Sequence, residues 1–124
     1  MVPYVRIAPS SPDLINYVLN AGAGGVVIPH VQNADQAANL VRTAKFPPLG
    51  DRSYPPMALL GRQTYTEPGK TVYDVWNENA ALFVQIEDVE GVKNIDAIAR
   101  VPGSKSKTML VKLSVYSDAD SQIL

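Results

Sequence analysis

The fold is decided by the stretch Leu82-Phe83-Val84-Gln85-Ile86-Glu87-Asp88, an apolar run that ends in an amide and two acids. Strong β-formers fill the run, which predicts a buried strand. Asp88 can cap a helix that follows at once. A carboxylate at the carboxyl end of a buried parallel strand can hold a metal ion or move a proton.

Two earlier runs also predict strands. Residues 2–8 contain Val5-Arg6-Ile7-Ala8, and residues 25–31 are apolar almost without interruption. Continuous apolarity predicts burial on both faces, as in a parallel sheet covered by helices.

Helix signals separate these predicted strands. Caps at Ser11, Asn33, Thr71 and Asp88 predict helices that end near Gly22, Ala44, Asn79 and Val101, and a short helix could span residues 57–63. The order β-α-β-α-loop-β-α is typical of a parallel α/β fold.

The chain changes character after Gly103. Residues 104–107 are polar, and apolar residues then alternate with polar ones from Met109 to Val115, a pattern that predicts a half-exposed strand. We therefore expect one α/β domain over residues 1–103 and a tail of uncertain fold over residues 104–124.

Composition excludes several classes of protein. The 124 residues carry a net charge of −1 with scattered basic residues, so we expect no nucleic-acid partner. No apolar run reaches membrane-spanning length, so we expect no membrane partner. The chain has no cysteine, which excludes disulfides and thiolate chemistry and favours a cytoplasmic protein.

Charged and polar side chains on the predicted strands indicate a ligand site. Arg6 lies within an apolar strand, where an unpaired charge is costly, so it needs an anionic ligand or a salt bridge. We expect Arg6 and residues 85–87 to face one small anionic ligand. Glu87 could instead be an acid at a helix start, and Asp88 is better explained as a helix cap than as a ligand.

Three other features are better explained by structure than by chemistry. His30 is the single histidine and follows a strand, where a structural role outweighs that of a general base. Asp51-Arg52 is expected to shape a loop or a subunit contact. Gly22, Gly24 and Gly25 come between a helix and a strand, which is the wrong order for a dinucleotide-binding loop.

Four motifs occur in a fixed order: Val5-Arg6-Ile7-Ala8, the stretch from Gly25 to Ala34, Phe46-Pro47-Pro48-Leu49-Gly50-Asp51-Arg52-Ser53 and Val84-Gln85-Ile86-Glu87. Together they resemble the pyruvate-type class II aldolases of the HpcH/HpaI aldolase/citrate lyase family, over residues 2 to about 103. The resemblance implies a TIM (β/α)8 barrel, of which this chain supplies about the middle four βα units.

The resemblance also implies a chemistry. The family cleaves 4-hydroxy-2-oxo acids by a retro-aldol reaction into pyruvate, or a related oxo acid, and an aldehyde, with Mg²⁺, Mn²⁺ or Co²⁺ as cofactor. By this likeness Arg6 is the catalytic arginine that holds the keto oxygen and steadies the enolate. Gln85 lies beside the bound oxo acid, and Glu87 is the first metal carboxylate.

The chain departs from the family pattern at two kinds of position. The motif that supplies the second metal carboxylate is replaced by residues 104–124, where only Asp118 or Asp120 could substitute. A helix acid that the family links to proton transfer is replaced by Asn20.

Two functions follow. The first is a divalent-metal-dependent carbon–carbon lyase, incomplete in this chain. The second is a truncated, non-catalytic barrel fragment that is inactive or binds a full-length partner. Because an open sheet exposes strand edges, we expect homo-oligomers.

Overall fold

The computed structural model describes residues 1–8, 11, 13–55, 68–102 and 109–113, and the following account concerns these residues. The predicted helix over residues 57–63 and the candidate acids Asp118 and Asp120 lie outside them. The elements, in chain order, are β1 (Tyr4–Arg6), α1 (Asp13–Asn20), β2 (Gly25–Ile28), α2 (Ala34–Ala44), α3 (Val72–Asn79), β3 (Ala81–Ile86), α4 (Val89–Lys93), α5 (Ile95–Ala99) and β4 (Met109–Leu113).

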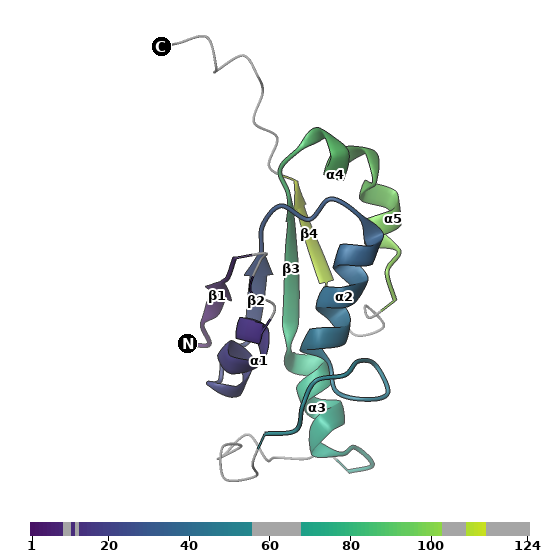
Figure 1. Ribbon diagram of the computed structural model, residues 1–124. Helices are drawn as coiled ribbons and strands as arrows, with labels where there is room; N and C mark the ends of the chain where they lie inside the picture. Colours follow the sequence, from purple (N-terminus) through teal and green to yellow (C-terminus); the bar gives the residue numbers. More distant parts are fainter. Residues whose placement is uncertain (9–10, 12, 56–67, 103–108, 114–124) are drawn as a thin grey trace.

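The strands form one parallel sheet in the order β1-β2-β3-β4, so spatial order follows chain order (Figure 1). Arg6 pairs with Val27, and Val27 with Phe83, while Lys112 pairs with Gln85. Side-by-side addition of consecutive βα units is how a (β/α)8 barrel is built. The predicted α/β class is therefore confirmed, and the sheet is a partial barrel of four strands. The strand predicted from Met109 onward is confirmed as β4.

The main core lies between the sheet and the helices. In β3 the buried residues are Leu82, Val84 and Ile86, whereas the residues between them are half-buried. The buried set packs against residues of α1, α2 and α5, namely Ile15, Leu19, Ala37, Leu40, Val41, Ala44 and Ile98. The strand predicted at residues 82–88 is therefore buried on the face that carries Leu82, where these helices pack, and half-buried on the other face.

Side-chain caps set the starts of three helices as the sequence predicts. The side chain of Asn33 accepts a hydrogen bond from the Gln36 N–H at 2.9 Å. Thr71 forms a capping box with Asp74, and Asp88 caps α4. These bonds satisfy backbone donors that a helix start leaves unpaired.

The helix predicted after Asp88 is broken in two at Asn94, which corrects the expectation of one continuous helix. The Asn94 side chain donates to the carbonyl oxygen of Gln32 at 2.9 Å. An asparagine whose side chain is held by another segment competes with continued helix formation.

Within the described residues, no helix is both long and apolar enough to span a bilayer.

Candidate functional site

The carboxyl edge of the sheet brings Arg6 and Gln85 together. Arg6 ends β1 and Gln85 lies in β3, with β2 between them. The Arg6 Nε donates to the Gln85 Oε1 at 3.1 Å. Only a long side chain can cross an intervening strand, because neighbouring strands lie about 4.8 Å apart.

Arg6 is exposed, which corrects the prediction of a buried arginine. In β1 only Val5 is half-buried, and the residues on either side of it are exposed. The reason is that β1 is an edge strand of the described sheet. The guanidinium is therefore open to a ligand while it is held on one side by Gln85.

Glu87 follows β3 directly, at the same edge. Its side chain is 12% exposed, and its Oε2 accepts a hydrogen bond from the His30 N–H at 3.2 Å. The His30 ring is 60% exposed, with its Nε2 3.6 Å from the same oxygen. His30 has a φ of 55°, a left-handed conformation that is uncommon for a residue other than glycine. The adjacent Val31 N–H donates to the Gln85 carbonyl at 3.0 Å. The turn after β2 is thus hydrogen-bonded to the end of β3 through both His30 and Val31.

Asp88 is a helix cap, as the sequence predicts. Its Oδ1 accepts from the Gly91 N–H at 2.7 Å, and its Oδ2 accepts from the Gln32 Nε2 at 2.7 Å. The bond from Gly91, followed by that from Gln32, lowers the pKa of the Asp88 carboxyl below its usual value. Because both oxygens are engaged, Asp88 is poorly placed to ligate a metal ion.

The residues at this edge fit one ligand position of a divalent cation and not a complete site. Among the described residues there is no group of three or more His, Cys, Asp or Glu side chains that could hold a metal ion. Glu87 offers an oxygen, which suits a hard cation such as Mg²⁺. Such an ion is commonly held by one or two carboxylates, with water and substrate oxygens in its other positions.

Sequence reasoning missed the residues that pack the opposite, amino edge of the sheet. Arg52 is 2% exposed and donates through its Nη2 to the Asn20 Oδ1 at 2.6 Å. The Asn20 departure therefore affects packing at the amino edge. Asp51 instead forms an exposed ion pair with Arg42. The sequence predicts that Asp51-Arg52 shapes a loop or a subunit contact, but no local pattern distinguishes a buried loop arginine from an exposed one.

Residues 1–115 match the family model of HpcH/HpaI aldolase/citrate lyase. The chain belongs to the HpcH/HpaI aldolase/citrate lyase family. The match includes β4 and extends past Gly103, so the boundary expected after that residue stays a prediction.

Relatives in this family are named as aldolases. The chain is 34% identical over 101 residues to 2-dehydro-3,6-dideoxy-6-sulfogluconate aldolase of Pseudomonas putida, covering 82% of this chain and 38% of that protein. It is 35% identical to hydroxypyruvate/pyruvate aldolase of Pseudomonas aeruginosa, covering 82% of this chain and 37% of that one. The chain thus spans about two fifths of the length of these relatives.

Solved structures show the same architecture. An HpcH/HpaI aldolase from Desulfitobacterium hafniense superimposes with a TM-score of 0.73 at 31% identity, over 92% of this chain and 42% of that one. Macrophomate synthase gives a TM-score of 0.68 at 28% identity, over 97% of this chain and 40% of that one. The four-stranded sheet therefore corresponds to part of the fold of these family members.

Proposed function

We propose that Arg6, Gln85 and Glu87 form part of the oxo-acid site of a divalent-metal-dependent carbon–carbon lyase. The proposed reaction is retro-aldol cleavage of a 4-hydroxy-2-oxo acid to pyruvate, or a related oxo acid, plus an aldehyde. The observation that carries this proposal is the 3.1 Å contact between the Arg6 Nε and the Gln85 Oε1, at the edge where Glu87 also lies. The names of the relatives support the reaction class.

The chemistry of these side chains suits that reaction. Cleavage next to a ketone leaves an enolate, and a guanidinium placed beside the developing oxyanion stabilises it. Within the described residues only the Arg6 Nε is engaged, so the other N–H donors of its planar fork can hold a keto oxygen and a carboxylate together. Gln85 fixes the Arg6 Nε and thereby orients the fork.

Glu87 is the residue that would hold the divalent cation, Mg²⁺, Mn²⁺ or Co²⁺. The bond from the His30 N–H engages its Oε2, which leaves the Oε1 for ligation. When bound, such an ion acts as a Lewis acid that polarises the keto oxygen.

A second function is a non-catalytic fragment that is inactive or pairs with a full-length partner. It is favoured because Glu87 is the one carboxylate that the described edge leaves for a metal ion, since Asp88 is engaged as a helix cap. The described residues also contain no group of three or more His, Cys, Asp or Glu side chains that could hold such an ion. We also propose a cytoplasmic setting, supported by the absence of cysteine, and homo-oligomers, supported by the two edge strands β1 and β4 of the described sheet.

Metal-dependent stabilisation tests the site. We expect Mn²⁺ with pyruvate to raise the melting temperature of the wild-type chain, because a ligand that binds only the folded state stabilises it, by about 2.7 kcal/mol at 100 times its Kd. Glu87→Gln should abolish the response to metal. Arg6→Lys keeps the charge but loses the fork, so it should keep the response to metal and lose that to pyruvate. The control is Glu78→Gln in α3, the same chemical change on a helix that leads into the amino end of β3.

The results separate the candidates. A response of Glu87→Gln equal to that of the wild type would refute the ligand assignment. NMR can detect the aldol addition of pyruvate to an added aldehyde. If the protein binds metal and pyruvate but NMR shows no addition product, the non-catalytic fragment is favoured. Product formation that requires both Arg6 and Glu87 would favour the lyase.

A further inference from the structure

The Arg52 guanidinium is buried without a negative partner among the described residues. Its Cζ lies 4.5 Å from the centre of the Phe46 ring and 4.9 Å from that of the Trp76 ring. The Nη2 donates to the Asn20 Oδ1 at 2.6 Å, but the buried Nε has no hydrogen-bond partner in the described part of the chain. Apart from these two ring contacts, the buried charge is held by one neutral amide, so the site favours an anion.

The unpaired Nε defines the kind of anion. The Nε and Nη2 of an arginine share one edge, and a carboxylate meets that edge with two parallel hydrogen bonds. Asn20 presents a single uncharged oxygen to it. Two oxygens of one carboxylate would satisfy both nitrogen atoms and neutralise the charge.

A second buried cation strengthens the preference for negative charge. Lys45 is 1% exposed, and its Nζ donates to the main-chain oxygens of Asn77 and Ala80. Burial, followed by the positive charge of Arg52, lowers the pKa of Lys45 to about 8. The two main-chain oxygens that Lys45 contacts are neutral and leave its positive charge uncompensated. An anion near Arg52 would therefore be attracted by both Lys45 and Arg52.

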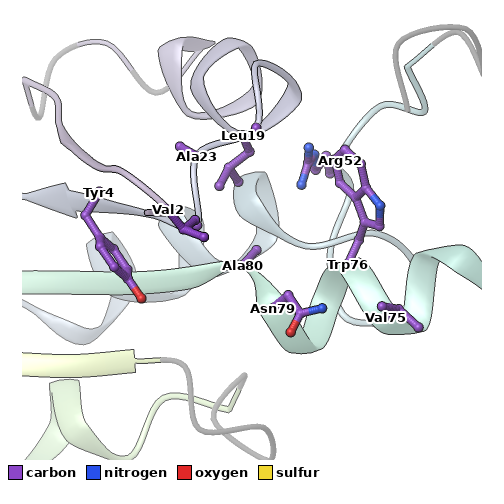
Figure 2. Close-up of a pocket in the computed structure, with 11 residues that line it drawn as sticks. Val2, Tyr4, Leu19, Ala23, Arg52, Val75, Trp76, Asn79 and Ala80 are labelled. Carbon is purple, nitrogen blue, oxygen red and sulfur yellow. The ribbon is translucent and has the colours of Figure 1, made fainter. Parts of the chain in front are cut away.

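Arg52 lines a hollow of about 520 Å³ at the amino edge (Figure 2). Val2, Gly24 and Ala80, which precede β1, β2 and β3, line this hollow, so it lies at the sheet edge opposite to Arg6 and Glu87. Most of its wall is apolar, while Asn79 and Tyr4 add polar atoms at its side. The apolar lining residues are Val2, Leu19, Ala23, Val75, Trp76 and Ala80. A volume of this size with a few polar groups is typical of a site for a small organic molecule.

We propose that this amino-edge hollow binds a small organic carboxylate with a hydrophobic body. The carboxylate takes the place of the Asn20 oxygen at the Arg52 edge and meets the Nε as well as the Nη2. The body of the ligand packs against Leu19 and Ala80. This site is separate from the proposed oxo-acid site and does not depend on it.

The fluorescence of Trp76 provides the assay, because it is the single tryptophan of the chain and it lines the hollow. The probe is cyclohexanecarboxylate, which does not absorb at the excitation wavelength. Cyclohexylmethanol is the neutral probe of the same shape, and inorganic phosphate is an anion without an apolar body. We expect a saturable change in Trp76 emission with cyclohexanecarboxylate and none with cyclohexylmethanol or phosphate.

Asn20→Asp is the decisive variant, because it supplies an internal carboxylate to Arg52 with almost no change in shape. Binding of the probe should weaken at least about tenfold, since a paired cation no longer attracts an external anion. Arg52→Gln should also lose binding, and Asn20→Asp remains informative if Arg52→Gln does not fold. The matched control, Asn39→Asp on α2, adds the same charge at a position that does not line the hollow, and should bind as the wild type does.

The proposal fails if the wild type shows no saturable response to cyclohexanecarboxylate. It also fails if the alcohol or phosphate binds as tightly, or if Asn20→Asp binds the probe with unchanged affinity.

Discussion

Replacing Asn77 by alanine should test how the start of β3 is held. Asn77 is 4% exposed and lies in α3, the helix that leads directly into β3 (Figure 1). Its Oδ1 accepts from the Phe46 N–H at 2.7 Å, and its Nδ2 donates to the Phe46 carbonyl at 3.1 Å. One side chain thus bonds both main-chain groups of a buried loop residue. The Phe46 carbonyl also accepts from the N–H groups of Leu49 and Gly50, at 3.1 and 3.2 Å, whereas the Phe46 N–H has no other partner among the described residues.

The expected loss follows from the bond that the Phe46 N–H makes. A buried main-chain group left without a partner costs about 1–3 kcal/mol. With one such group, Asn77→Ala should lower the free energy of unfolding by about 1–3 kcal/mol. Urea denaturation, followed by circular dichroism, should show a lower midpoint with an unchanged slope.

Asn79→Ala is the control, because Asn79 is exposed and ends the same helix. Its free energy of unfolding should change by no more than about 0.5 kcal/mol. Equal losses for the two variants would refute the reasoning, since helix propensity and not the pair of bonds to Phe46 would then explain them.

Three further predictions concern pH, packing and capping. Because the pKa of Lys45 falls from 10.5 to about 8 on folding, the folded state binds fewer protons between these values. The free energy of unfolding should therefore rise from about pH 8 to pH 10.5, by up to about 3 kcal/mol, and this rise should be missing in urea titrations of Lys45→Met. A rise of the same size in both proteins would exclude Lys45 as its source. Gly91→Ala would place a Cβ 2.8 Å from the Ile86 Cγ2, so it should cost about 1–3 kcal/mol in urea denaturation, and an unchanged midpoint would contradict the packing of α4. Thr71→Ala removes the acceptor of the Asp74 N–H and should lower the melting temperature by an amount equivalent to about 1 kcal/mol, whereas Thr71→Ser should retain most of the stability.

Local sequence determined the elements of this fold and the edge at which its charged groups gather. Short-range signals suffice for caps such as Asn33, Thr71 and Asp88, because the bonding partners lie within three residues. Parallel strands end at one edge, so Arg6 and Glu87 could be assigned to the same edge before any contact was known. Their roles in binding an oxo acid and a metal ion stay predictions.

Tertiary structure alone decided which side chains are buried and which segments are interrupted. The exposure of Arg6 depends on its strand being at the edge of the described sheet, and the break at Asn94 depends on the carbonyl of Gln32. Arg52 is buried because the rings of Phe46 and Trp76, far apart in the chain, lie beside its guanidinium. Such contacts are set by the packing of distant segments, and no local pattern of residues encodes them.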